Sequence, residues 1–325
     1  MCATIDLIKN MMTENNIQKG VLLVNMGGPL NEKDMKTFLV RMFNDPHIMP
    51  LNILGRKALA FLISNSRYKK SWAKYELIGG TPIVETTNKM TQSLADILPE
   101  HHVKMAFSYS PPFIGDVLKT FSDEDIKHIH VIPQYPHYSF TTYQSVLDEC
   151  ARFFKMDPSV HITYAPPYFG HPLYISFWAE LVKKHCEKEN LNSPMLLFSA
   201  HSIPMTFVEK GDTYPQEIAE SAKLIAESVN MKFEVSYQSQ IKGSAWVGPP
   251  TPEVMKRLKS EGVEELVIIP ISFVTENLET MYDLDHDLVP FGKNTIGIKH
   301  VSRVRIDFET NTYLELLRDL AEKKK

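Results

Sequence analysis

The sequence predicts an α/β fold of two similar Rossmann-like lobes, each with a mainly parallel four-stranded sheet flanked by helices. Short apolar runs bounded by turn residues, typical of buried strands, alternate with stretches of helical spacing. Strands that alternate with helices form βαβ units and parallel sheets. Four of these runs precede residue 170 and four follow it, at 21–24, 105–107, 129–132, 161–164, 195–198, 233–237, 266–271 and 296–301.

The two halves of the chain also echo each other. Residues 21–29 and 195–204 both read as strand, turn and proline, and residues 130–133 and 267–270 both end in Ile-Pro. We therefore predict an N-terminal lobe over 20–166, a C-terminal lobe over 167–305 and a cleft between them. A leader over 1–19 precedes the lobes, and a C-terminal helix within 306–325 is expected to pack back on them.

Composition and charge exclude several classes of protein. Of the 325 residues, 43% are hydrophobic and 23% charged, as in a globular protein of ordinary composition. The net charge of −4 argues against a nucleic-acid binder. Cys2, Cys150 and Cys186 lie far apart, so they predict neither a disulfide framework nor a cysteine-rich cluster. No apolar run reaches the roughly 18 residues of a membrane span, and we expect a cytoplasmic protein.

The stretch PMLLFSAHSIP over residues 194–204 places His201 where a predicted strand ends. In open α/β sheets, ligands bind in the crevice beyond the carboxyl ends of the strands. A histidine there can exchange protons near neutrality or hold a metal ion. The alternative is a buried histidine whose ring is satisfied by a backbone carbonyl.

A row of acidic residues follows the seventh predicted strand, on a helix that Thr275 is expected to cap. Steps of three, four and four residues put four carboxylates on one helical face, namely Glu276, Glu279, Asp283 and Asp287. No Lys or Arg occurs between Lys259 and Lys293, so the local sequence supplies no cation. Such a row predicts a proton relay or a path for a divalent cation. Acids are also favourable near a helix N-terminus, which would explain Glu276 and Glu279 alone.

Apolar residues crowd between Ile48 and Ile63, and Arg67, Lys69 and Lys70 follow. One interpretation is a core helix with a basic C-terminus. The other is an apolar lip beside the cleft that contacts a hydrophobic ligand or a membrane surface. We expect core packing for most of these residues, although the two interpretations can hold on different faces.

Several loops after predicted strands carry aromatic or small residues. Residues 25–29 (NMGGP) lack both nucleotide-binding glycine patterns, so we expect the glycines to let the backbone approach a flat surface closely. Aromatic residues in the loops 134–139 and 237–240, with Met26 and Trp246, would form a broad flat-walled pocket. Ser199 and Ser202 lack the context of a serine hydrolase.

The combination of these stretches resembles ferrochelatase. Residues 197–204 with 211–215, and residues 273–285, are similar to the two signature blocks of that family. Five further stretches match it, at 23–29, 75–82, 134–136, 237–239 and 246–251. The resemblance runs from about residue 20 to the end and implies the chelatase-like two-lobed fold. It implies a bacterial lyase that inserts Fe²⁺ into protoporphyrin IX to form protoheme, the terminal step of heme biosynthesis.

The resemblance also implies roles for individual residues. His201 and Glu279 form the central pair, in metal coordination, pyrrole proton abstraction or both. Glu276, Asp283 and Asp287 would form a proton relay or metal path. The residues implied to bind the porphyrin are Met26, Tyr75, Tyr109, Gln134, Tyr135, Ser239 and Trp246. Residues 134–138 are similar to the protoporphyrin-using branch of the family rather than the coproporphyrin-using branch.

This chemistry agrees with the residue types. Metallation removes two pyrrole protons, and a ring bound in distorted form exposes its nitrogen lone pairs. A neutral His201 can take a proton, Glu279 can stabilise the imidazolium, and the acidic row can carry the proton to water. Carboxylates and an imidazole also suit ferrous iron that must be handed on.

Three features depart from the family pattern. Asn277 replaces a common histidine, Ser108 stands where many relatives have an arginine, and no cysteine follows Cys186. We therefore expect no [2Fe–2S] cluster and no permanently bound cofactor. The expected partners are protoporphyrin IX and ferrous iron, a membrane surface contacted at its inner face through residues 48–63, and, transiently, the preceding enzyme of heme synthesis. The alternatives are a chelatase for coproporphyrin with iron or sirohydrochlorin with cobalt, or a non-catalytic heme or porphyrin carrier.

Overall fold

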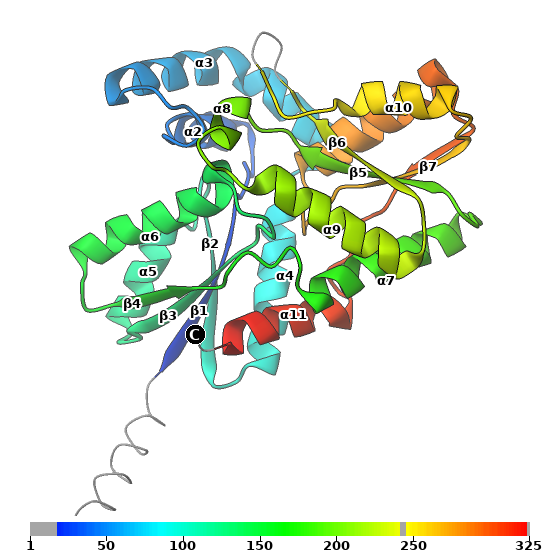
Figure 1. The fold of residues 1–325 in the computed structure, drawn as a ribbon. Helices are drawn as coiled ribbons and strands as arrows, with labels where there is room; N and C mark the ends of the chain where they lie inside the picture. Colours follow the sequence, from blue (N-terminus) through cyan, green and yellow to red (C-terminus); the bar gives the residue numbers. More distant parts are fainter. Residues whose placement is uncertain (1–17, 241–244, 324–325) are drawn as a thin grey trace, which may run out of the picture.

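The structure is a computed structural model that describes residues 18–240 and 245–323. Within these ranges all eight predicted strands are present, and every strand pairing is parallel. They form two four-stranded sheets with helices on both faces, so the predicted fold class is confirmed (Figure 1). Residues 1–17 of the predicted leader lie outside the described residues.

The two sheets have the same topology. The first has the order β2-β1-β3-β4, and the second has the order β6-β5-β7-β8, which is the first order shifted by four strands. The strands are β1 (Lys19–Asn25), β2 (His101–Phe107), β3 (His128–Pro133), β4 (His161–Tyr164), β5 (Met195–His201), β6 (Phe233–Gln238), β7 (Glu265–Ile269) and β8 (His300–Arg303). The echoing motifs of the sequence thus lie on equivalent strands, β1 with β5 and β3 with β7. The prediction for β8 began four residues too early, because η3 (Phe291–Ile296) precedes it as a π-helix.

Helices cover both faces of the first sheet, because its strands are apolar on both sides. Leu22 and Val24 pack with α5 (Ile114–Asp123) and α6 (Ser145–Met156), which follows the short π-helix η1 (Phe140–Gln144). Val21 and Leu23 alternate with them and face the core that contains α4 (Pro82–Ile97). This alternation follows from the two-residue period of a strand.

The second sheet is covered in the same way. One face packs on α7 (Pro172–Lys188) and α9 (Tyr214–Val229), and α8 (Met205–Val208) lies between β5 and α9 in the chain. The other face packs on α10 (Thr251–Ser260) and on the π-helix η2 (Glu279–Leu288).

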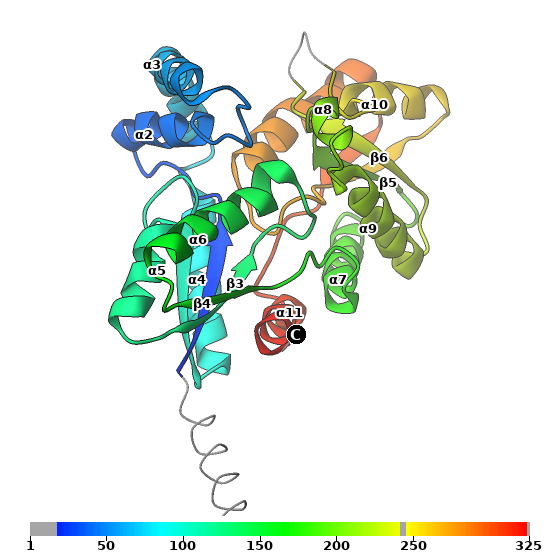
Figure 2. The ribbon, with the colours of Figure 1, turned by 60° about the vertical axis from the view of Figure 1, so that its left-hand side comes forward.

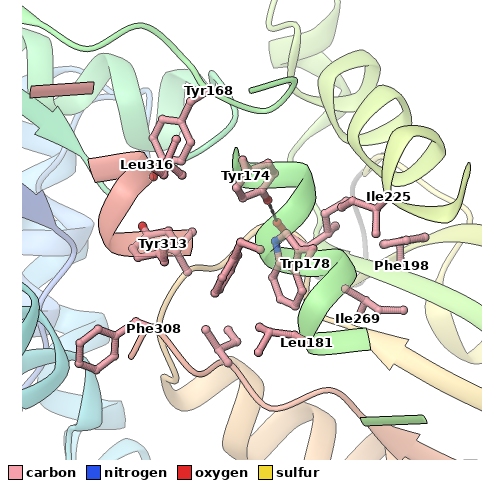
Figure 3. Packing of buried hydrophobic residues seen from close by; sticks show 14 of the residues in the cluster. Tyr168, Tyr174, Trp178, Leu181, Phe198, Ile225, Ile269, Phe308, Tyr313 and Leu316 are labelled. Atoms are coloured by element: carbon pink, nitrogen blue, oxygen red, sulfur yellow. Dashed lines mark hydrogen bonds between the residues drawn. The ribbon is translucent and has the colours of Figure 1, made fainter. Parts of the chain in front are cut away.

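One continuous apolar core joins the lobes around α11 (Asn311–Glu322), which lies between them in Figures 1 and 2. Figure 3 shows Tyr313 of α11 among Tyr168, Trp178 and Leu316. The Tyr313 ring lies 4.9 Å from that of Phe177 on α7. Because α11 also contacts α4 and β3 of the first lobe, it fixes the lobes relative to each other.

The apolar segment after residue 48 forms part of a long helix, α3 (Ile53–Leu77), which packs on α2 (Glu32–Phe43). Figures 1 and 2 show both helices at the top of the molecule, and the C-terminal end of α3 reaches the second lobe, where Lys74 pairs with Asp283. Leu54, Phe61 and Leu62 are 79%, 58% and 62% exposed, so the expectation of core packing is wrong for these residues. α2 covers one side of α3 and leaves this side open. None of the described helices is long and apolar enough to cross a membrane.

Candidate active site

The predicted site residues gather where the strand order reverses in each sheet. In the first sheet the chain leaves β1 and β3 in opposite directions, and in the second it does so at β5 and β7. Such switch points form the crevices in which α/β proteins bind ligands. Met26 follows β1, His201 ends β5, and Glu279 follows β7 by ten residues. Leu278 of the second lobe packs against the apolar cluster of the first lobe that contains Tyr75 and Tyr109, as Met26 does, so the two crevices adjoin.

The hydrogen bonds of His201 determine which ring nitrogen is free. Its backbone N–H donates to Ser272 Oγ (3.2 Å), and its Nδ1 lies 2.8 Å from the carbonyl oxygen of Ser202. A carbonyl only accepts, so Nδ1 carries the proton and Nε2 presents the lone pair. The backbone-carbonyl contact of the second interpretation is therefore present at Nδ1, whereas Nε2 of the half-buried ring keeps its lone pair.

Glu279 is the first residue of η2 and lies within electrostatic reach of His201. Burial raises the pKa of its carboxyl group, and the charge of His201 opposes this rise while that of Asp283 adds to it. Burial also raises the pKa of Tyr75, and the Glu279 charge raises it further. The structure therefore brings His201, Glu279, Asp283 and Tyr75 together.

The helix that carries the acids begins later than predicted. The turn is built by Asn277 and Thr280, because Asn277 Oδ1 accepts from the Thr280 N–H (3.0 Å) and Thr280 Oγ1 accepts from the Asn277 N–H (3.0 Å). Asn277 thus acts as the cap that we assigned to Thr275. Glu276 precedes the helix and does not share its face with Glu279.

The prediction of an uncompensated acidic row is wrong, because the fold supplies the cations that the local sequence lacks. Glu276 pairs with Arg303 of β8 (2.9 Å), and Asp283 pairs with Lys74 of α3 (3.5 Å). Asp283 also accepts a hydrogen bond from Ser239 Oγ (3.1 Å). Asp287 is exposed.

Four of the predicted porphyrin-binding residues belong to the first lobe, namely Met26, Tyr75, Tyr109 and Tyr135. Met26, Tyr75 and Tyr109 belong to one apolar cluster with Phe38 of α2. The Tyr109 hydroxyl donates to Asp45 Oδ2 (2.8 Å), and Ser108 makes a side-chain hydrogen bond to Tyr135. Ser108, which stands where many relatives have an arginine, therefore orients Tyr135.

The second lobe contributes Ser239 and Trp246. Ser239 is exposed and has a positive φ of 63°, in the loop after β6. Trp246 is partly buried and forms a bridge with Pro204, three residues after His201.

Gln134 ties β3 to α11. Its side chain is buried, its Oε1 accepts from the Tyr313 hydroxyl (2.9 Å) and its Nε2 donates to the Ile132 carbonyl (3.2 Å). Both ends of the amide are engaged inside the protein, and the contact of Gln134 with the porphyrin stays a prediction.

The glycines after β1 lie close to other parts of the protein. Gly27 has a φ of +80°, and a Cβ there would lie 2.7 Å from the Cβ of Phe107. A Cβ on Gly28 would collide with Thr81. The close approach that we expected from these glycines is therefore made to the protein itself, where the loop packs on Phe107 of β2 and on Thr81 before α4.

Sequence reasoning missed Lys74, Arg303 and Ser272. Lys74 directly precedes the matching stretch 75–82, which is a signal that could have found it. Arg303 and Ser272 had no comparable signal. His201 Nε2 and the Glu279 carboxylate are the groups that could hold a metal ion in transit, and no cluster of three or more His, Cys, Asp or Glu side chains suited to a metal occurs among residues 18–240 and 245–323.

Comparisons with known proteins agree with this geometry. The sequence model of the family described as Ferrochelatase matches residues 18–325. The chain is 36% identical over 312 residues to the ferrochelatase of Aquifex aeolicus. The match covers 94% of this chain and 99% of the relative. It is 33% identical to the coproporphyrin III ferrochelatase of Enterococcus faecalis, which covers 82% of this chain and 88% of the relative.

The solved structure of SirB from Bacillus subtilis with Fe³⁺ is similar in fold, with a TM-score of 0.58 at 14% identity, over 94% of this chain and 96% of that one. The chain belongs to the ferrochelatase family, and it is an enzyme that inserts a metal ion into a porphyrin.

Proposed function

We propose that the enzyme inserts Fe²⁺ into protoporphyrin IX, with His201 as the proton acceptor. The observation that carries this proposal is the tautomer of His201, whose Nδ1–H is held by the Ser202 carbonyl while Nε2 keeps its lone pair beside Glu279. A neutral imidazole in this state can take a pyrrole proton directly.

Metallation releases two protons as Fe²⁺ replaces the two pyrrole hydrogens, so the protons need a route to water. His201 Nε2 accepts a proton, and the Glu279 carboxylate stabilises the resulting imidazolium. Asp283 lies within electrostatic reach of Glu279, and Asp287 is exposed, so these three carboxylates connect the buried site to solvent. We assign the relay to Glu279, Asp283 and Asp287. Glu276 is left out because Arg303, the Ile306 N–H and Thr280 engage both of its oxygens, whereas the ion pair of Asp283 with Lys74 is partly exposed.

Protoporphyrin is supported by the apolar character of the pocket wall. Met26, Tyr75, Tyr109 and Leu278 contribute apolar surface, which suits a ring with vinyl groups. Coproporphyrin carries propionates in place of these vinyl groups, and burying each extra carboxylate would need a cation. The similarity to the Enterococcus faecalis enzyme makes coproporphyrin III the competing substrate.

Anaerobic turnover on each porphyrin, followed optically, tests the substrate. We expect kcat/KM for Fe²⁺ insertion to be at least about tenfold higher with protoporphyrin IX than with coproporphyrin III, which corresponds to about 1.4 kcal/mol in the transition state. The opposite order would assign the enzyme to coproporphyrin. Tight binding of both rings without a metal-dependent spectral change would indicate a carrier.

We also propose that the exposed face of α3 contacts a membrane surface. Leu54, Phe61 and Leu62 share one helical face, since their spacing is i, i+7 and i+8. Lys57 and Arg67 are exposed on the same helix and suit anionic headgroups. This contact would deliver an apolar porphyrin beside the site. A cytoplasmic location and a transient contact with the preceding heme-pathway enzyme remain predictions.

Flotation with vesicles of phosphatidylglycerol and phosphatidylcholine tests the membrane contact. We expect the wild type to float with the vesicles and the triple variant Leu54→Ser/Phe61→Ser/Leu62→Ser to remain below. Met156→Ser is the matched control, because Met156 is 76% exposed on α6 rather than on α3. Equal flotation of the triple variant and the wild type would refute the proposed surface.

A further inference from the structure

We propose that Arg303 is a positioning residue for metal insertion, which holds the turn that presents Glu279. The inference rests on the proposed function of Glu279 and extends it to a residue that contacts neither substrate. It also gives Glu276 a different role from the relay that the sequence predicted.

The guanidinium of Arg303 is a buried hub with nearly all of its donors in use. Its side chain is 1% exposed. Nε and Nη2 donate to the two carboxylate oxygens of Asp285 at 2.7 and 2.8 Å, a bidentate pair. Nη1 donates to Glu276 Oε1 at 2.9 Å and to the Val304 carbonyl at 3.2 Å. Burial opposes the charge, but the two carboxylates outweigh it and raise the pKa of Arg303. The hub is therefore charged throughout the working range of pH.

The two carboxylates that Arg303 holds flank Glu279 in the sequence. Glu276 comes three residues before it, and Asp285 comes six residues after it within η2. Glu276 is itself fully engaged, since Oε1 also accepts from the Ile306 N–H (2.8 Å) and Oε2 accepts from Thr280 Oγ1 (2.5 Å). Through Glu276 and Thr280, Arg303 reaches the Asn277–Thr280 turn that sets the start of η2.

This region needs an external support because of its backbone. η2 is a π-helix of ten residues, and π-helices are rare and usually limited to a single turn. Their wide turns forgo the tighter packing of an α-helix. Two anchors to one strand residue compensate for this, since Arg303 belongs to β8 at the edge of the second sheet. The position of the Glu279 carboxylate is thereby fixed relative to a rigid sheet.

Neighbouring Arg305 cannot take over this role. Its side chain is 64% exposed, and among the described residues its one ion pair is with Asp285, through Nη1 at 3.2 Å. An exposed ion pair of this kind contributes little to stability. Arg305 therefore offers a matched control, with the same residue type on the same Asp285 but without a link to Glu276.

The test compares Arg303→Lys with Arg305→Lys. Lysine keeps the charge but is a point donor, so it cannot hold Asp285 at two oxygens and Glu276 at the same time. We expect Arg303→Lys to lower kcat for Fe²⁺ insertion about 10–100-fold, the range typical of residues that orient a functional group. The KM for porphyrin should stay within twofold, because the pocket wall of Met26, Tyr75 and Tyr109 is untouched. Arg305→Lys should match the wild type in both.

Stability measured on the same samples separates positioning from a merely structural role. Arg303→Met leaves two carboxylates without their buried cation, and we expect a lower melting temperature and an even lower kcat, provided that it folds. If it does not fold, Arg303→Lys decides alone. A melting temperature that falls in Arg303→Lys while kcat stays within twofold of the wild type overturns the proposal. So does a porphyrin KM that rises in step with the loss of kcat.

The wild type in the same assay separates this inference from the proposed function. If wild-type enzyme shows no insertion of iron into any porphyrin, the proposed function fails. If the wild type turns over and Arg303→Lys turns over equally well, only the role of Arg303 fails.

Discussion

His137 makes the stability of the native state depend on pH in a predictable way. Its ring is buried between the lobes, 6.0 Å from each of the rings of Tyr174 and Tyr214. Nε2 lies 2.9 Å from Ser221 Oγ, and among the described residues Nδ1 has no hydrogen-bond partner. A cation here would lose its hydration without gaining a carboxylate, so burial lowers the pKa of His137 to about 3.

The sign and the size of the effect follow from this shift. The unfolded chain binds a proton at His137 near pH 6.5, whereas the native state does not, so native stability falls as the pH falls below 6.5. The native stability that depends on a neutral His137 is present above pH 6.5 and is lost progressively as the pH falls towards 3. Each pH unit within that window costs about 1.4 kcal/mol. Between pH 7.5 and pH 5.5 the loss amounts to about 1.4 kcal/mol, roughly three quarters of it below pH 6.5.

Urea unfolding of the wild type and His137→Gln at these two pH values measures the effect. Glutamine can donate to Ser221 as Nε2–H does, but it does not titrate. The wild type should lose about 1.4 kcal/mol more than the variant between pH 7.5 and pH 5.5, because other titrating groups cancel in the difference. His128→Gln, at an exposed position of β3, should follow the wild type. Equal losses in the wild type and His137→Gln would refute a native state that excludes the imidazolium.

Three further predictions concern substitutions in the active site and in the core between the lobes. His201→Ala should fold normally but lose about 10²–10⁴-fold in kcat for iron insertion, the usual contribution of a general base, and turnover close to the wild type would exclude it as the proton acceptor. Glu279→Gln should lower kcat about 100-fold with an unchanged porphyrin KM, since it removes the charge that stabilises the imidazolium, and unchanged kinetics would remove it from the mechanism. Tyr313→Phe should lower the free energy of unfolding by about 1–3 kcal/mol, because it leaves the buried carbonyl of Gln134 unpaired, and calorimetry should show this without a change in porphyrin KM.

The sheets could be predicted because their signal is local. A strand buried on both faces reads as a continuous apolar run, and each of the eight runs is short and bounded by turn residues. The echo between residues 21–29 and 195–204 also located equivalent strands, since the same strand, turn and proline pattern recurs where the same topology recurs. His201 could be placed at a strand end for the same reason.

The electrostatics of the acidic segment could not be predicted, because its partners are distant in sequence. Arg303 follows Glu276 by 27 residues, and Lys74 precedes Asp283 by more than two hundred. The helical period of 3.6 residues also assumed a regular α-helix, whereas Asn277 and Thr280 delay its start and η2 has π-helical hydrogen bonds. A row of like charges in a sequence therefore shows how many charges need a partner. It does not show which distant residues supply the opposite charge.

The same distinction applies to Gln134 and to the exposed residues of α3. Gln134 belongs to a stretch that resembles the family's pocket, yet its amide is satisfied by Tyr313 from the far end of the chain. Leu54 and Phe61 have the composition of a core, yet α2 covers only one side of their helix. In both cases residue type was read correctly and the partner was not. The partner of Gln134 comes from α11, and the cover of α3 comes from α2. The roles of such residues are therefore decided by tertiary packing that no local pattern encodes.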